Sequence, residues 1–434
     1  MPETPPSTVP SARKAAAAFI LVTVFIDMLS IGVIIPVLPN LIKSFLGGSV
    51  SEAGLWTGIF GAAWGLAQFL FTPVQGGLSD AIGRRPVVLA SNFGTGVDFL
   101  FMALAPGLWW LLIGRIISGM TSASISTAYA YMSDVTPPEK RAGVYGLMGA
   151  AFGVGFVVGP SLGGLLGGGL HWGMIQFNGD HHYPFFFAAA LSLCNFLYGL
   201  FVLPESLPKD RRKPFSFHTA NPLGAIRFLA RSAQVMRLSL MYFLLMFGQS
   251  VFPTTMVLYA AYRFGWGPTE VGLMLAVVGI LSAIVQGGLT GVITKRIGER
   301  KAMYIGIGAS LIAYTAYGLA PNWQIFVGFI AIGCFGGLAM PNIQSLMSSK
   351  VDPKEQGTLQ GSNMSLTTMG NIVSPLIFGY VLSVVTKPGV AIFYSGAAFL
   401  VAAFCTLLCL WLATGVKQSL TVEKAYGGEP QIDG

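Results

Sequence analysis

Long apolar runs alternate with short polar connections along almost the whole chain. Twelve runs approach the length of about 20 residues that a helix needs to cross a hydrocarbon core of about 30 Å. We expect helices, because backbone groups in lipid must satisfy their hydrogen bonds within the segment. The predicted spans cover residues 15–38, 54–75, 87–106, 108–132, 143–169, 184–203, 235–262, 269–293, 302–320, 323–348, 357–386 and 389–415.

Composition agrees with this pattern. Of the 434 residues, 53% are hydrophobic and 10% are charged, and the mean hydropathy is +0.68. In a soluble protein about 25% of residues are charged. All four cysteines lie inside apolar runs, so neither a disulfide framework nor a zinc site is indicated. The sequence therefore predicts an all-α membrane protein with twelve transmembrane helices.

The basic residues predict the orientation of these helices. Of the 25 Lys and Arg residues, only Lys43, Arg263 and Lys387 fall in the loops of one face, and Arg115 falls inside a span. Cytoplasmic loops carry the excess of basic residues, so we expect both termini in the cytoplasm. Topology and anionic lipid then explain the net charge of +8, and nothing indicates a nucleic acid partner.

One long charged connection divides the chain. The sequence predicts five successive parts: a cytoplasmic tail (1–14), a six-helix bundle (15–203), a cytoplasmic linker (204–234), a second six-helix bundle (235–415) and a cytoplasmic tail (416–434). Within the linker, Asn221 followed by Pro222 is typical of a helix start, and the apolar spacing after it predicts a short interfacial helix.

The two halves repeat each other. Four landmarks recur 215 positions later, with Gly83, Pro106, Pro138 and Pro160 followed by Gly298, Pro321, Pro353 and Pro375. A constant offset close to half the chain length predicts two six-helix pseudo-repeats, with a substrate site near the midplane between them.

The connection from Gly76 to Pro86 carries the densest group of charges between two spans. Asp80, Arg84 and Arg85 lie within it, and Gly83 with Pro86 predicts a tight turn that holds these charges close together at the membrane surface. A solvated hairpin with positive-inside arginines is the alternative reading.

Three ionisable residues lie inside spans of the first half. Asp27 and Asp98 are each roughly 18 Å from the cytoplasmic ends of their helices, and Arg115 is roughly 20 Å from that side. Because a lone charge in hydrocarbon costs at least a few kcal/mol, such residues pair or line water. We favour Asp27 with Arg115 as a pair able to exchange a proton. A purely structural ion pair is the alternative, and Asp98 has the alternative of a hydrogen-bonded structural group.

The fifth span is rich in glycine. Gly155, Gly159 and Gly163 recur every four residues, which predicts a smooth stripe that another helix backbone can approach closely. Pro160 permits a bend, and Gly164 follows the stripe.

The second-half spans hold polar but uncharged candidates for a cavity: Gln249, Gln286, Asn342 and Gln344. Each has the alternative of an interhelical hydrogen bond. His171, Asp180, His181 and His182 cluster in an outward loop, but their spacing matches no strong metal pattern. We find no phosphate loop, nucleophile triad or dinucleotide motif, so no enzyme activity and no bound cofactor is expected.

These motifs carry a resemblance to a known family. Gly-x-Leu-x-Asp-x-x-Gly-Arg-Arg-Pro, from Gly76 onward, resembles the signature loop of the major facilitator superfamily, in which the Asp and Arg are thought to latch one conformation through a charge relay. The glycine motif around Pro160 resembles that of drug:proton antiporters. Asp27, Asp98 and Arg115 lie in sequence similar to the tetracycline-efflux branch, where the matching residues are implicated in proton and drug handling.

The second half departs from that branch. Tetracycline pumps carry a His in helix 8 and an Asp in helix 9, and the positions aligned with them here are Ser282 and Ser310. Apart from Glu270, the second residue of the 269–293 span, the second-half spans contain no acid, and they contain no His. The departure argues against metal-chelate coupling of the tetracycline type.

The resemblance implies the major facilitator fold and a proton-coupled antiporter that exports a hydrophobic or amphipathic small molecule by alternating access. We expect a multi-pass monomer in a bacterial inner membrane, powered by the proton gradient. Two alternatives are an importer of a polar solute such as a sugar and a sensor that moves no substrate.

Overall fold

The computed structural model describes residues 9–121, 124–137, 140–172, 175–212, 214, 228–352 and 355–416. In these ranges eleven helical stretches are long and apolar enough to cross a membrane. The shorter apolar helix α5 (Leu108–Thr121) and α6 (Ser124–Val135) occupy the predicted fourth span. The all-α prediction with twelve spans is confirmed, and the predicted interfacial helix at Asn221 lies outside the described residues.

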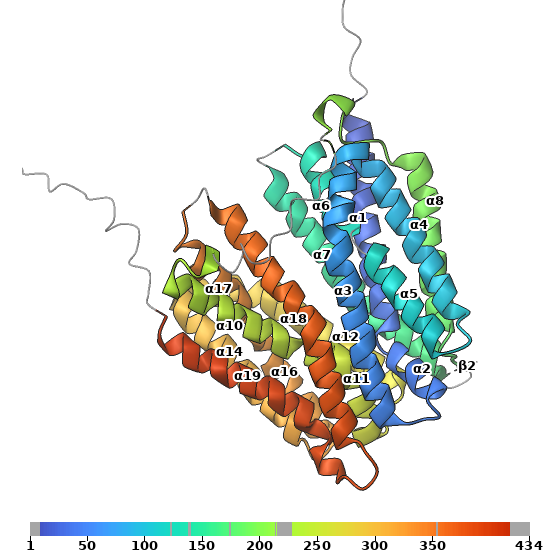
Figure 1. Ribbon diagram of the computed structural model, residues 1–434, viewed down its shortest axis with the longest axis vertical. Helices are drawn as coiled ribbons and strands as arrows, with labels where there is room; N and C mark the ends of the chain where they lie inside the picture. The colour runs from blue at the N-terminus through green and yellow to red at the C-terminus, as the bar shows by residue number, and fades with distance from the viewer. Residues whose placement is uncertain are drawn as a thin grey trace, which may run out of the picture. The chain divides into compact units, whose positions relative to one another are not determined.

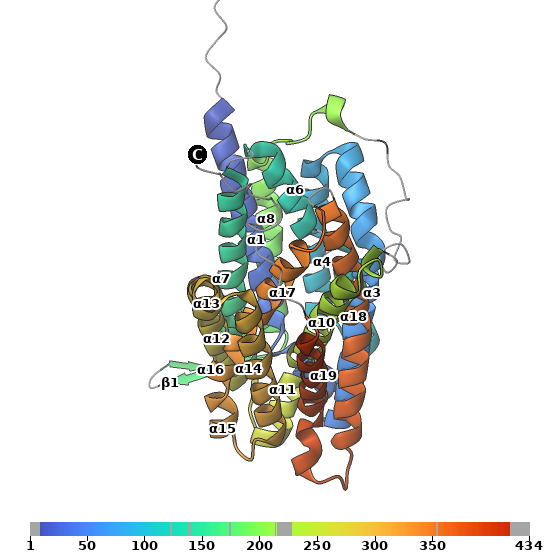
Figure 2. The same cartoon turned by 90° about the vertical axis from the view of Figure 1, so that its left-hand side faces the viewer.

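The helices group into two compact units, and the first comprises residues 1–220, 250–280 and 371–398. It contains α5, α6, α1 (Val9–Ile34), α2 (Leu38–Phe45), α3 (Val50–Ile82), α4 (Arg84–Ala103), α7 (Arg141–Gly168), α8 (Tyr183–Val202), the 3₁₀ turn η2 (Lys209–Arg211), α11 (Val251–Phe264), most of α12 (Pro268–Ala283), the second half of α18 (Gln356–Val385) and η6 (Ile392–Gly396) (Figure 1). Strands β1 (Leu170–Trp172) and β2 (Ile175–Phe177) add a small antiparallel hairpin after α7 (Figure 2).

The second unit comprises residues 221–249, 281–370 and 399–434. It contains α10 (Ala233–Gln249), the π-helical segment η3 (Ile284–Leu289), α13 (Thr290–Ile297), α14 (Glu299–Leu319), α15 (Trp323–Gly328), α16 (Ile330–Cys334), the 3₁₀ segment η4 (Phe335–Leu338), α17 (Ala339–Ser348), the first half of α18 and most of α19 (Ala397–Thr414). Buried side chains such as Leu238, Ile307 and Ile343 form its core. The boundary between two six-helix bundles stays a prediction.

The turn between α3 and α4 is much shorter than expected. The sequence predicts eleven residues between the spans, but α3 continues to Ile82 and α4 begins at Arg84, so that Gly83 alone separates them. Gly76 therefore lies inside α3. Gly83 has φ +115°, a conformation that side chains rarely adopt. Gly298, with φ +83°, makes the same one-residue turn between α13 and α14, which agrees with the internal repeat.

The glycine stripe of α7 packs against α1. A Cβ atom added to Gly155 would lie 2.7 Å from the Phe25 carbonyl oxygen, and one added to Gly159 would lie 2.7 Å from that of Leu29. A Cβ at Gly163 would collide with the backbone of Val33. The predicted close approach of a helix backbone is therefore present, and the helix is the one that carries Asp27.

Gly164 lies beside the stripe and contacts a different helix. A Cβ atom there would lie 2.5 Å from the Pro268 carbonyl oxygen and 3.0 Å from Gly272 Cα, both in α12. The motif thus serves two contacts, three glycines facing α1 and one facing α12.

We expect Gly159→Ala to lower the midpoint of thermal unfolding in detergent by a few °C, because overpacking a close contact costs about 1–3 kcal/mol. Gly153→Ala is the matched control, since Gly153 lies in the same helix and a Cβ added to it meets no atom within 4 Å. Equal midpoints for the two variants would contradict the contact.

Candidate functional site

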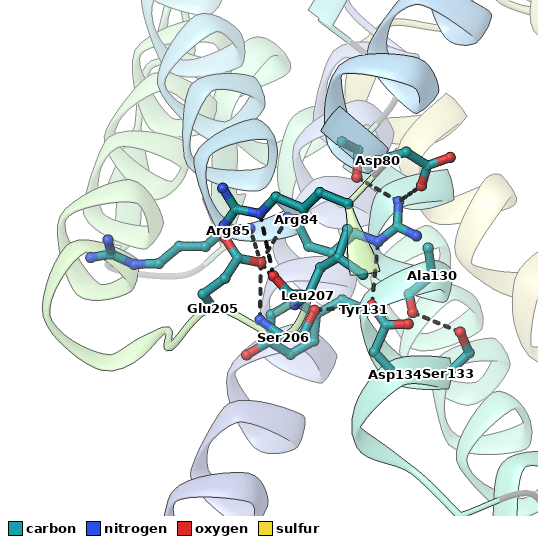
Figure 3. Close-up of polar contacts among 12 residues, drawn as sticks. Asp80, Arg84, Arg85, Ala130, Tyr131, Ser133, Asp134, Glu205, Ser206 and Leu207 are labelled. Carbon is teal, nitrogen blue, oxygen red and sulfur yellow. Dashed lines mark hydrogen bonds and ion pairs between the residues drawn. The ribbon is translucent and has the colours of Figure 1, made fainter. Parts of the chain in front are cut away.

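The Arg84 side chain lies between two carboxylates at the start of α4. Its Nη1 is 2.5 Å from Asp80 Oδ1, one turn back across Gly83, and its Nε is 3.3 Å from Asp134 Oδ2 at the end of α6 (Figure 3). Nη1 also donates to Ser79 Oγ over 2.8 Å. The Arg84 side chain is only 14% exposed, so this ion pair is less screened by water than a surface pair. It joins α3, α4 and α6.

Glu205, just after α8, binds the same turn through the backbone. Its Oε1 accepts from the N–H groups of Arg84 at 2.8 Å, Ser206 at 3.0 Å and Leu207 at 3.0 Å, with Arg85 N more distant at 3.5 Å (Figure 3). A carboxylate at the first turn of α4 satisfies N–H groups that have no partner within the helix and favours the positive end of the helix dipole. Glu205 therefore fixes the segment after α8 to the start of α4.

Other contacts hold this arrangement in place. Arg85 Nη2 donates to the Leu200 carbonyl at the end of α8 over 2.8 Å, and Tyr131 Oη donates to the Pro204 carbonyl over 2.8 Å. A Cβ atom at Gly83 would collide with the Glu205 carboxylate, so only glycine allows this close approach as well as the positive φ. We call Asp80, Arg84, Asp134 and Glu205 the turn cluster.

Within the spans, the acid that acts on Arg115 is Asp98. Both residues lie where α4 packs against α5, and Asp98 is fully buried. The Ser118 hydroxyl also lies near, but neither carboxylate oxygen receives a well-aligned hydrogen bond from a described residue. A Cβ atom at Gly114 would lie 3.2 Å from Asp98 Oδ1, so the glycine allows α5 to approach the carboxylate.

Arg115 has a second neighbour. Its guanidinium lies 5.6 Å from the ring centroid of Trp64 in α3, within the range of a cation–π contact. Its Nε is buried and makes no hydrogen bond to a described residue. The guanidinium is thus subject to the charge of Asp98 and lies against one aromatic face, with no direct ion pair between these two described side chains.

Asp27 is 7% exposed on α1. The pairing of Asp27 with Arg115 stays a prediction, while the acid whose charge acts on Arg115 in the structure is Asp98. The physical reason is the packing of the helices, since α5 packs on α3 and α4 while α1 packs chiefly on α7 and α8.

The chain matches the Major Facilitator Superfamily profile over residues 20–285 and 238–426. The chain belongs to this superfamily. It is 39% identical to the class C tetracycline resistance protein of Escherichia coli over 91% of this chain and 95% of that protein. It is 34% identical to the class G tetracycline resistance protein of Vibrio anguillarum over 92% of this chain and 96% of that protein.

Solved structures of other transporters have the same fold. A mutant of the nucleoside transporter NupG aligns with a TM-score of 0.75 at 14% identity, over 93% of this chain and 100% of that chain. The human organic anion transporter MFSD10 aligns with a TM-score of 0.65 at 23% identity, over 92% of this chain and 99% of that one. The major facilitator resemblance is confirmed, and the chain is a membrane transporter rather than an enzyme.

Sequence reasoning on this major facilitator protein missed two members of the turn cluster. Asp134 lies just after the predicted fourth span and Glu205 just after the sixth, so that each is an acid directly beyond an apolar run, on the side that the basic residues predict to be cytoplasmic. The signal was weak, because an acid at a helix end is usually solvated. Only the fold brings both to Arg84.

The described part of the loop between α7 and α8 makes structural contacts. His182 Nδ1 lies 2.8 Å from the Ala103 carbonyl at the end of α4, and the His182 backbone N–H donates to Asp180 Oδ1 over 2.7 Å. Burial lowers the pKa of His181 below its usual value, which favours the neutral ring. Among the described residues no three His, Cys, Asp or Glu side chains gather as metal ligands.

Two of the polar candidates in the second-half spans of this transporter make interhelical hydrogen bonds. Asn342 Oδ1 accepts from Thr294 Oγ1 over 3.2 Å, and Gln344 Nε2 donates to Tyr242 Oη over 3.1 Å. Gln249 is exposed at the end of α10, and Gln286 lies in η3.

We expect Glu205→Ala to lower the transport rate severalfold, because three backbone N–H groups within 3.0 Å of Oε1 lose their acceptor. Glu205→Gln keeps an acceptor oxygen and should retain most of the rate. The measurement is drug-dependent proton movement in vesicles, normalised to the amount of protein.

Glu355→Ala is the control, since the Glu355 side chain is 47% exposed in an ion pair with Arg231 and exposed pairs contribute little. If Glu205→Ala transports like wild type, the backbone contacts of Glu205 do not matter for the cycle.

Proposed function

We propose that this protein exports an amphipathic drug of the tetracycline type in exchange for protons, with Asp98 and Arg115 at the centre of the coupling. The observation that carries the proposal is a fully buried carboxylate whose charge acts on one buried cation, with the Ser118 hydroxyl near but no well-aligned hydrogen bond from a described residue to either oxygen. A structural ion pair would gain from having its remaining polar atoms satisfied. A pair that must release and regain a proton benefits from having few fixed donors.

The coupling follows from elementary electrostatics. Arg115 near Asp98 favours the charged carboxylate, and burial favours the protonated one. A small shift of α5 relative to α4 changes the balance, so that proton occupancy of Asp98 depends on conformation or on bound drug. Asp27, nearly buried on α1, is a second proton-binding candidate. This role for the two acids is consistent with the tetracycline resistance relatives, and the energy source is the proton gradient without a bound cofactor.

The turn cluster has a separate role in this proposal. Ion pairs and backbone hydrogen bonds at the α3–α4 turn stabilise one conformation of the cytoplasmic side, and transport requires some of them to break and re-form. Arg84 holds α6 through Asp134, and Glu205 holds the segment after α8, so both must respond when these helices move. Alternating access then proceeds by movement of packed helices.

The membrane orientation, the cellular location, the lipid contacts and the oligomeric state are also proposals. The distribution of Lys and Arg supports two cytoplasmic termini. Bacterial sources of the tetracycline resistance relatives support an inner-membrane location. The basic cytoplasmic face suits contact with anionic lipid. We propose a monomer as the transporting unit.

We expect tetracycline added to acidified inside-out vesicles to release protons in the wild type. In Asp98→Asn the release should fall to background, because the amide cannot carry the proton. A dye that reports the pH gradient gives the measurement, and Asp27→Asn run alongside asks whether the second acid is also needed. Asp210→Asn, an exposed acid in η2, is the control for loss of a negative charge.

Drug-dependent release at the wild-type rate in Asp98→Asn would remove Asp98 from the coupling. If tetracycline and other lipophilic drugs move no protons in the wild type, proton antiport of drugs is wrong. Uptake of sugars would then test the importer alternative.

A further inference from the structure

Two interruptions of regular helix meet in the second unit. The π-helical η3 continues α12 into α13, and the 3₁₀ segment η4 joins α16 to α17. The two segments contact each other, and η4 also packs on α14. In Figure 2, α13 and α14 of this unit lie side by side. Interruptions of this kind are found at membrane depth where they are buried in protein or line a cavity.

The interruptions lie near the middle of the spans. Gln286 in η3 and Ser310 in α14 are each twelve residues from Gly298, the turn between α13 and α14. Gly337 in η4 is eleven residues from the end of α17 at Ser348. At about 1.5 Å per residue all three are roughly 16–18 Å from the same side. They form one layer at the depth where transporters of this type bind substrate.

Two polar side chains approach the Gly336–Gly337 pair from different helices. A Cβ atom at Gly337 would lie 2.8 Å from Gln286 Cγ and 3.2 Å from Nε2. A Cβ atom at Gly336 would collide with Ser310 Oγ. The two glycines therefore leave space that the amide of Gln286 and the hydroxyl of Ser310 both enter.

Neither of these polar groups has a hydrogen-bond partner among the described residues, and neither side chain is fully buried. Neighbouring polar groups, by contrast, do have hydrogen-bond partners. Asn342 donates to the Leu338 carbonyl and accepts from Thr294, and the Val285 carbonyl of η3 accepts both the backbone N–H and the hydroxyl of Thr290. An amide and a hydroxyl that face lipid without a hydrogen-bond partner would cost free energy. We therefore expect the accessible atoms of both side chains to face water or a polar ligand.

The helices that form this layer carry no ionisable Asp, Glu, His, Lys or Arg at its depth. No Asp, Glu, His, Lys or Arg lies between residues 271 and 293, between 302 and 320 or between 323 and 348. An amide supplies both donors and an acceptor, and a hydroxyl supplies one donor and two lone pairs. An uncharged ligand group that both donates and accepts hydrogen bonds would satisfy this amide and this hydroxyl. It offers no carboxylate or imidazole to a metal ion.

We propose that Gln286, Ser310 and the Gly336–Gly337 notch form the substrate subsite of the second half, which takes a neutral carboxamide or similar group of the drug without a divalent cation. The proposal rests on the proposed function and adds the chemical group recognised. The Gln286 amide and the Ser310 hydroxyl bind that group, while the glycines keep the space open for it. Gln344, by contrast, is engaged with Tyr242.

The test compares tetracycline, which carries a carboxamide, with its nitrile analogue, which lacks the amide donor. Dissociation constants are measured by ligand-induced quenching of tryptophan fluorescence, using the purified full chain in detergent with EDTA. Wild type should bind the carboxamide about threefold to tenfold more tightly than the nitrile, the range expected for a neutral hydrogen bond. In Gln286→Met, which keeps the length of the side chain, that preference should vanish.

Ser310→Ala and Gly337→Ala should weaken carboxamide binding in the same direction, the second by filling the notch. Gln324→Leu, which replaces an exposed glutamine in α15, should leave both constants unchanged. The midpoint of thermal unfolding identifies any variant that fails to fold. If Gln286→Met fails in this way, Gly337→Ala tests the subsite without changing Gln286.

Equal binding of the two compounds by wild type would overturn the subsite, as would a preference that survives in Gln286→Met. Loss of tetracycline binding on adding EDTA would overturn metal-free recognition. If wild type binds neither compound while drug-dependent proton release also fails, the proposed function falls and this inference falls with it. If proton release succeeds but the preference is absent, only the subsite is wrong.

Discussion

Lipid cannot hydrogen-bond to the backbone, and this constraint shapes the rest of the structure. It requires helices in the spans, and it leaves helix association to close packing and to a few polar contacts. The backbone approach of α7 to α1 through Gly155, Gly159 and Gly163 is the clearest result. Polar groups without such a packing role then stand out, and they are the ones to which a function can be assigned.

The sequence predicted the backbone features better than the pairing of charges. The span count, the turn at Gly83 and the glycine stripe each depend on a local pattern or on a residue with special backbone freedom. Arg115 was assigned to Asp27 because depth along a helix can be counted from sequence. Rotation of a helix about its axis cannot be counted in this way, and it is the rotation and packing of α4 and α5 that select Asp98.

The two repeats preserve the turn and change its chemistry. In the first, Arg84 follows Gly83 and pairs with Asp134 at the end of α6. In the second, Glu299 follows Gly298 and accepts a hydrogen bond from Ser345 in α17. Both residues reach from the start of one helix to a helix of the following predicted span. Duplication thus explains the shared geometry, while the first half has the buried acid Asp98 and the second has the layer around Gln286, which contains no acidic, basic or His side chain.

The π-helical segment adds a geometric consequence for the second half. A π turn accommodates one more residue than an α-helical turn, and each α-helical residue advances about 100° around the axis. Deleting a single residue from Ile284–Leu289 would restore regular α-helix. Because the wider π turn absorbs the rotation of the extra residue, α13 would keep its present direction, and Lys295 and Arg296 would stay on their present side. The extra residue therefore widens the helix at the level of Gln286 without changing the direction in which the charged end of α13 points.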